Sequence, residues 1–290
     1  MGAPLRAARD WLEEVVGAGE TPLMDSLQAF FLALIQGLTE FLPVSSSAHL
    51  ILPSQLLGWT DQGLAFDVAV HAGTLVAVIV YYRQSLISLC LAGLGSGDSV
   101  SASRRELMCL FIASVPALLL GFTFSAAIDE YLRGVGVIAT TTLLFGLLLG
   151  VSYSYRSMGT EEQPITRYDH ALLIGLAQAL ALIPGTSRSG VTITASLFLG
   201  YNLATAARFS FLMSIPVIAG ALLVMVVTES ALFFSSANMT LTVTAMLVAA
   251  VSAYATIAFF VGLVTRVGMM PFVIYRVLLA LILFSILVFV

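Results

Sequence analysis

Lysine is absent from this sequence, and charged residues of all kinds make up only 10% of its 290 residues. A soluble domain carries roughly 25% charged residues, so this chain has too few to cover a surface that faces water. Hydrophobic residues make up 59% of the chain, and they occur in long runs. These features exclude a soluble globular enzyme and predict an all-α polytopic protein whose solvent is a lipid bilayer.

Basic residues and cysteines are also scarce. All twelve basic residues are arginines, the net charge is −4 and no basic patch is present, which excludes binding to nucleic acid. The two cysteines, Cys90 and Cys109, lack the spacing of metal ligands and fall in or beside apolar segments. We expect both to be small buried hydrophobic residues.

Six apolar segments meet the length needed to cross a bilayer, about 20 mostly apolar residues. They lie at 64–82, 107–128, 135–155, 209–227, 241–264 and 272–290. Two further apolar stretches, 24–57 and 171–200, contain proline, serine, glycine and other polar residues, which predicts a short helix, a polar turn and a second short helix in each. Lipid tolerates such breaks only inside protein or beside a wet cavity, so both stretches are predicted to be re-entrant hairpins.

The two interrupted stretches resemble each other. FLPVSSSAHL begins at Phe41 and LIPGTSRSGV at Leu182, and three spans follow each of them. After an N-terminal segment over 1–22, expected to lie at the membrane interface, the chain is predicted to use one unit twice, as repeat 1 over 23–155 and repeat 2 over 156–290. Because three is odd, the second copy enters from the opposite side. The result is an inverted-topology repeat whose polar turns meet near the midplane.

The arginines predict the orientation of this domain. If both hairpins return to the side from which they start, one side holds Arg83, Arg104, Arg105, Arg156, Arg167, Arg208 and Arg266, whereas the other holds Arg6, Arg9 and Arg133. The side with more arginines is cytoplasmic by the positive-inside rule. Both termini are therefore predicted to be periplasmic or extracellular.

The first polar turn carries groups that can do chemistry. Gln36 and Glu40 are four residues apart and share one face of a helix, and three serines and His49 follow within nine residues of Glu40. A carboxylate in an apolar stretch is costly unless it is paired or binds a cation. One interpretation is a structural ion pair with serines that cap a helix; the other, which we favour, is a functional site.

The second turn is small, hydroxylated and basic. Arg188 has a planar guanidinium that suits phosphate oxygens, and a helix that restarts after the turn directs free N–H groups at an anion. We expect an oxyanion cradle formed with Gly185, Thr186, Ser187 and Ser189. The alternative is a structural bridge between Arg188 and Glu40, and the two can coexist.

Two further polar residues lie within predicted spans. Arg276, in the last span, is either part of the site or an interhelical bridge. His71 follows Asp67 by four residues near the start of the first span, where it either touches the site or is an ordinary interfacial residue. The sequence does not decide between these alternatives.

These residues together resemble the undecaprenyl-diphosphate phosphatase family, also called bacitracin-resistance proteins. The first family motif ends in Glu-Phe-Leu-Pro-Val-Ser-Ser-x-x-His and is found here at 40–49, and the second, Pro-Gly-x-Ser-Arg-Ser-Gly, at 184–190. FSFLMSIP at 209–216 and PFVIYR at 271–276 agree as well. The resemblance covers most of the chain beyond about residue 22 and is specific, since two long motifs stand at matching positions.

The resemblance implies an enzyme of the bacterial inner membrane. It would remove the terminal phosphate from undecaprenyl diphosphate to give the monophosphate that carries cell-wall precursors, it would confer bacitracin resistance, and its site would open toward the periplasm. The expected partners are the polyprenyl diphosphate, membrane lipid and a second copy in a homodimer. A lipid flippase is the alternative, because transporters also use inverted repeats with broken helices.

The resemblance also implies roles for individual residues. Ser46 is the expected nucleophile, His49 the acid or base, Arg188 the phosphate clamp, and Glu40 a ligand of a divalent cation or part of the chemistry near it. Many members have Glu where this chain has Gln36, which can bind a cation but cannot act as a base. Further phosphate contacts are expected from Ser45, Ser47, Gly185, Thr186, Ser187, Ser189 and Arg276.

Several points stay open at the level of sequence, and the oligomeric state is one of them. The cation can be Mg²⁺ or Ca²⁺, since both take oxygen ligands. Either Ser46 or a water molecule can attack the phosphorus atom. The preferred polyprenyl length is undetermined.

The other membrane lipid-phosphatase superfamily is excluded, because its motif requires Lys and because Thr194, not His, stands six residues after Arg188.

Overall fold

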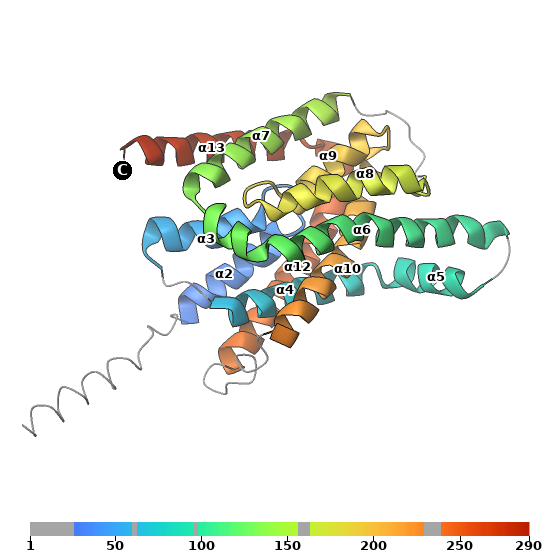
Figure 1. Cartoon of the computed structure of the whole chain (residues 1–290), viewed down its shortest axis with the longest axis horizontal. Coiled ribbons are helices and arrows are strands. Elements are labelled where there is room, and N and C mark those ends of the chain that lie inside the picture. The colour runs from blue at the N-terminus through green and yellow to red at the C-terminus, as the bar shows by residue number, and fades with distance from the viewer. Residues whose placement is uncertain (1–25, 60–62, 96–97, 156–162, 229–238, 290) are drawn as a thin grey trace, which may run out of the picture.

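Every element that the structure describes is a helix, in keeping with a chain whose backbone groups must be bonded internally in lipid (Figure 1). The computed structural model describes residues 26–59, 63–95, 98–155, 163–228 and 239–289, so the predicted interfacial segment over 1–22 lies outside the described residues. The helices are α2 (Ser26–Thr39), α3 (Ser46–Leu57), α4 (Gly63–Tyr81), α5 (Arg83–Leu94), α6 (Asp98–Tyr131), α7 (Val135–Ser154), α8 (Tyr168–Ala179), the 3₁₀ helix η1 (Leu180–Leu182), α9 (Arg188–Phe198), α10 (Leu203–Thr228), α12 (Met239–Val267) and α13 (Met270–Phe289).

Five described helices are long and apolar enough to cross a membrane, and they coincide with five of the six predicted spans: α6, α7, α10, α12 and α13. The remaining prediction, 64–82, is α4, which is followed by α5 at a bend of 75° and makes a sixth candidate if the pair counts as one span. The sequence did not predict α5 or the first turns of α6. These two helices pack together, and Arg104 of α6 donates to the carbonyls of Gly93 and Gly95 at the end of α5.

One expectation about cysteine is wrong. Cys109 of α6 is buried as predicted, but Cys90 of α5 is exposed. The difference follows from α5 itself, because an unpredicted helix that packs mainly on α6 leaves its other faces uncovered.

Each interrupted stretch consists of two short helices around a turn. In both, the residue directly before the second helix is a serine with positive φ, Ser45 at 74° and Ser187 at 70°, and these are the two non-glycine residues with positive φ in the described chain. In both, that serine Oγ lies near the Oγ of the serine two positions later, at 3.2 Å for Ser47 and 3.4 Å for Ser189. Such backbone geometry costs about 1–3 kcal/mol at each position and persists only where the surroundings impose it.

Each pair of short helices packs against the other half of the chain. The first helix of the first pair, α2, lies against α12, and the first helix of the second pair, α8, lies against α6. Glycines allow both contacts: a Cβ at Gly37 of α2 would lie 2.7 Å from the carbonyl oxygen of Ala249, and one at Gly175 of α8 would lie 2.6 Å from that of Ala113. This crossed packing brings the two polar turns together in the interior.

Candidate active site

A cavity of about 320 Å³ lies where the two turns meet. Its polar side consists of residues from both turns together with side chains of α4 and α8, and its apolar side comes from α6, η1 and α10. The lining residues are Glu40, Ser45, Ser46, Ser47, Asp67, His71, Gln178, Ser187 and Arg188 on the polar side, and Ala117, Ala181, Leu182, Val217, Ile218, Ala221, Leu222 and Met225 on the apolar side.

An ion pair joins the two turns across this cavity. Arg188 Nη2 donates to Glu40 Oε1 at 2.8 Å, and the two side chains are only 12% and 8% exposed. Arg188 Nη1 also donates to the carbonyl of Ser210 in α10 at 3.1 Å, and the guanidinium lies 5.7 Å from the ring centre of Phe41. The structural bridge between Arg188 and Glu40 is therefore present, and both residues line the cavity, whereas the phosphate contact of Arg188 stays a prediction.

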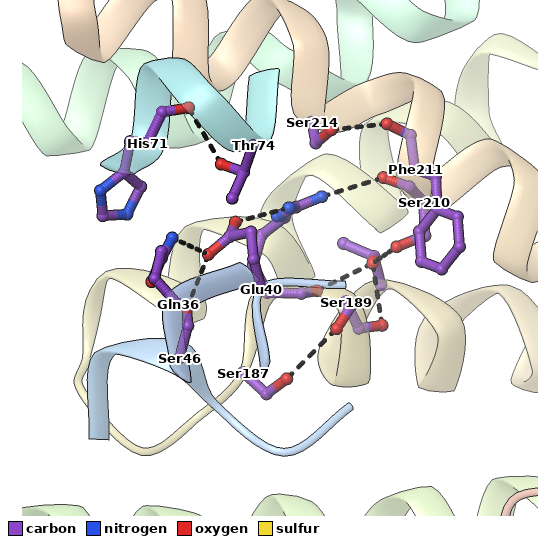
Figure 2. A network of polar contacts seen from close by, with 12 residues as sticks. Gln36, Glu40, Ser46, His71, Thr74, Ser187, Ser189, Ser210, Phe211 and Ser214 are labelled. Atoms are coloured by element: carbon purple, nitrogen blue, oxygen red, sulfur yellow. Dashed lines mark hydrogen bonds and ion pairs between the residues drawn. The ribbon is translucent and has the colours of Figure 1, made fainter. Parts of the chain in front are cut away.

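The second carboxylate oxygen of Glu40 holds a serine hydroxyl. Ser46 Oγ donates to Glu40 Oε2 at 2.6 Å, and Gln36 Nε2 donates to the same oxygen at 3.0 Å. Figure 2 shows both groups converging on this carboxylate. A hydroxyl within hydrogen-bond reach of a carboxylate that is itself fixed by an arginine is the arrangement of an activated nucleophile, its base and the group that orients the base.

His49 contacts the first turn and α13 and not the cavity, and its expected role as the acid or base stays a prediction. Its Nδ1 is 2.7 Å from the Ser45 carbonyl oxygen, its Nε2 is 2.5 Å from the Tyr275 hydroxyl, and its ring stacks on that of Tyr275 with 5.8 Å between centres. His49 is not among the residues that line the cavity. Ser46 begins α3 and turns back toward Glu40, whereas His49, almost one helical turn later, turns toward α13.

The histidine that lines the cavity is His71, whereas the sequence predicted His49. It reaches from α4 toward Gln36 and Glu40 (Figure 2). It lines the cavity together with Asp67. The signal in the sequence was a pair of polar residues four apart within an apolar segment. That pattern could not be distinguished from a polar pair at the membrane interface, because the sequence does not show which helices α4 packs against.

The residues of the second turn lie partly in the cavity and partly behind it. Ser187 accepts a hydrogen bond from the Gly190 backbone N–H at 3.2 Å and so begins α9. Ser189 Oγ donates to the Leu42 carbonyl of the first turn at 2.9 Å. Among the expected phosphate contacts, Ser45, Ser47 and Ser187 line the cavity, whereas Gly185, Thr186 and Ser189 do not.

Arg276 also lies outside the cavity, and its donors are engaged by the backbone. It is fully buried and donates to the carbonyls of Pro43 in the first turn and of Gly185 and Thr186 in the second, at 2.8–3.3 Å. It donates as well to Thr142 of α7 at 3.1 Å. These contacts match the interhelical bridge that the sequence offered as the alternative, and the phosphate contact of Arg276 stays a prediction.

The donor set offers a divalent cation a partial site. Among the described residues, no three His, Cys, Asp or Glu side chains gather closely enough to hold a metal ion. Gln36 Oε1, however, is buried beside Glu40 and has no hydrogen-bond partner in the described chain. Mg²⁺ commonly binds through one or two protein oxygens together with substrate phosphates, so Gln36 and Glu40 fit a cation that a diphosphate helps to hold.

Fold and site together define a helical membrane protein with a buried carboxylate and a partly buried serine and arginine at the junction of two broken helices. The sequence matches the family described as bacitracin resistance protein BacA over residues 29–282, which includes both turns and the whole cavity. It is 52% identical over 259 residues to a Saccharophagus degradans protein and 54% identical over 263 residues to an Alcanivorax borkumensis protein, both named undecaprenyl-diphosphatase. Each match covers 88% of this chain, and 96% and 97% of the respective relatives. The chain belongs to the bacitracin resistance protein family.

Proposed function

We propose that this protein is an integral-membrane undecaprenyl-diphosphatase. It hydrolyses undecaprenyl diphosphate to undecaprenyl phosphate and inorganic phosphate, recycles the lipid carrier of peptidoglycan and other cell-wall polymers, and thereby confers bacitracin resistance. The observation that carries the proposal is the Ser46 hydroxyl, held at 2.6 Å from a carboxylate that Arg188 fixes, in a cavity with one polar and one apolar side. Two relatives that carry this name match nearly the whole chain.

Ser46 is proposed as the nucleophile and Glu40 as its base. Ser46 Oγ forms a bond to the terminal phosphorus, its proton passes along the existing hydrogen bond to Glu40 Oε2, and the bridging P–O bond breaks to release undecaprenyl phosphate. Arg188 supplies positive charge where charge spreads over the phosphoryl oxygens. A guanidinium has five N–H donors, so Arg188 can contact phosphate while it keeps its bonds to Glu40 and Ser210.

The remaining site residues are proposed to divide into two groups. Ser45, Ser47 and Ser187 line the cavity and would contact phosphate oxygens. Gly185, Thr186, Ser189, Arg276 and His49 would position the turns, since their contacts are with backbone or with residues outside the cavity. Gln36 and Glu40 would hold a divalent cation, either Mg²⁺ or Ca²⁺. When bound, such a cation neutralises negative charge on the diphosphate.

The apolar side of the cavity is proposed to take the first isoprene units of the substrate. Val217, Ile218, Ala221, Leu222 and Met225 extend along one side of α10 and continue the cavity away from Arg188. The rest of a long polyprenyl chain would stay in the bilayer, so the cavity would have to open sideways to lipid. A small soluble phosphate ester would gain nothing from this surface, which favours a lipid diphosphate as substrate.

The membrane arrangement is proposed to be an inverted-topology repeat with six spans and two re-entrant hairpins in the bacterial inner membrane. The matching serine geometry of the two turns and the crossed packing of α2 on α12 and α8 on α6 support it. Both termini would be periplasmic. The cavity would open to the periplasmic side. It is lined by the first turns of α4 and the last turns of α10, and in this topology the N-terminus of α4 and the C-terminus of α10 are periplasmic.

Phosphate release by the purified protein tests the proposed function. In detergent with Mg²⁺, the protein is expected to release phosphate from undecaprenyl diphosphate, and Ser46→Ala is expected to lose at least about 100-fold in kcat. A folded wild-type protein that releases no phosphate would contradict the hydrolase. Full activity of Ser46→Ala would instead indicate direct attack by water. A flippase remains the second candidate, but transport does not require a serine held on a carboxylate.

A further inference from the structure

His71 presents its imidazole to the cavity in a way that the other histidines do not. The chain has three histidines, all among the described residues. His49 has both ring nitrogens engaged outside the cavity, and His170 contacts Tyr201 through Nδ1 at 2.8 Å, also away from it. His71 lines the cavity together with Ser46, Glu40 and Arg188.

The hydrogen bond of His71 determines which of its ring nitrogens can accept a proton. Its Nδ1 lies 2.6 Å from the backbone carbonyl oxygen of Asp67, one helical turn earlier in α4. A carbonyl oxygen can only accept, so Nδ1 carries the proton and the neutral ring keeps its lone pair on Nε2.

Around His71 the cavity contains few charges. Glu40 contributes a carboxylate from the end of α2, Arg188 a guanidinium from α9, and Asp67 a carboxylate from α4 itself. The helices α6 and α10 contribute only apolar side chains to the lining, and α12, which packs on α4, contributes none. Both Glu40 oxygens already hold Arg188, Ser46 or Gln36. A second proton acceptor for the reaction would therefore be Asp67 or His71, and of the two His71 is the one whose ordinary role includes taking up and releasing a proton near neutral pH.

We propose that His71 is a further catalytic residue, which activates the water that completes hydrolysis. This inference rests on the proposed function. In the second step a water oxygen bonds to phosphorus while the bond from phosphorus to Ser46 Oγ breaks. One water proton goes to His71 Nε2, and Ser46 Oγ recovers its proton from Glu40. Inorganic phosphate leaves, and His71 releases the proton that the overall hydrolysis of a diphosphate produces.

His71→Gln tests this assignment, because glutamine keeps polarity and similar length but cannot take up a proton. With purified protein, Mg²⁺ and undecaprenyl diphosphate labelled in the terminal phosphate, the variant is expected to release about one equivalent of undecaprenyl phosphate in a burst. Steady-state release of phosphate is expected to fall by about 100-fold or more, within the range for loss of an acid–base group. Acid quenching followed by mass spectrometry is expected to find phosphoserine at position 46.

His170→Gln is the matched control, since it makes the same change at a histidine outside the cavity. Steady-state turnover of His71→Gln within a few-fold of this control would overturn the proposal, and so would loss of turnover without a burst in a variant that melts like wild type. If His71→Gln does not fold, His71→Asn is judged by the same criteria. An inactive wild-type protein would instead refute the proposed function, so the two failures are distinguishable.

Discussion

Arg188 and Arg276 both contact the polar turns, and they differ in the groups that accept hydrogen bonds from their guanidiniums. Arg188 faces a carboxylate and a cavity, so part of its hydrogen-bonding capacity stays available to a ligand. Arg276 is completely buried and is surrounded by backbone carbonyls from both turns and from α7. We infer that Arg188 acts on the substrate and that Arg276 holds the two turns in register.

Arg276→Gln is expected to destabilise the protein more than it alters the chemistry. The substitution leaves several buried carbonyls without a donor, at about 1–3 kcal/mol for each. We expect Tm in detergent to fall by roughly 5 °C or more. Leu278→Ala, at an exposed position of the same helix, provides the control and is expected to change Tm little. An unchanged Tm in Arg276→Gln, together with a raised KM, would mean that Arg276 contacts the substrate after all.

At the scale of helices, the site depends on close approach between the two halves of the chain. Glu40 directly follows α2, and its position is set by how deeply α2 sits against α12. Gly37 makes this possible, since an added Cβ would lie 1.9 Å from Ser252 Oγ and 2.7 Å from the carbonyl oxygen of Ala249. A shift of α2 away from α12 would move the base as well as the helix.

Gly37→Ala is therefore expected to lower both stability and activity. Overpacking of this kind typically costs about 1–3 kcal/mol. Gly262→Ala in α12 is the matched control, because no atom lies within 4 Å of an added Cβ there. Alanine also has the higher helix propensity, by about 1 kcal/mol, so this control is expected to melt at the same or a higher temperature. Equal effects of the two substitutions on Tm and kcat would contradict the role given to close packing of α2.

The whole molecule has an orientation that can be tested independently of the chemistry. A fluorescent protein that matures only in the cytoplasm, fused after Phe289, is expected to remain dark, since the C-terminus is proposed to be periplasmic. The same reporter fused after Tyr155, where the third span ends, is expected to fluoresce. A bright C-terminal fusion would contradict the proposed topology, whereas phosphate release by the purified protein would be unaffected.

Most helices could be predicted from the sequence because a bilayer requires a certain length and composition of each span. The same requirement explains why α5 and the start of α6 were missed, since residues around Arg83, Arg104 and Arg105 are too polar to meet it. Those turns are helical because the two helices pack together, and Arg104 donates to carbonyls at the end of α5. Pairing of this kind leaves no regular hydrophobic period to detect.

The candidate site was predictable in its chemistry but not in its membership. Charge inside an apolar chain is costly, so Glu40 and Arg188 stood out, and the structure places them 2.8 Å apart. From the sequence, a role of Arg276 in the site and a role as an interhelical bridge were equally supported, since only its surroundings distinguish them. It favoured His49 over His71, because proximity along the chain was the only measure of distance available.

The sequence by itself determined that this chain resides in lipid, that two polar turns interrupt it, and which chemical groups those turns carry. Scarcity of charge was sufficient for that, since each buried polar group has to be satisfied within the protein. The tertiary structure decided which groups share the cavity. The crossed packing of the helices directs Ser46, Arg188 and His71 toward Glu40, and directs His49 toward Tyr275. Helical spacing defines the face on which a side chain lies, whereas the neighbouring helix determines what that face contacts.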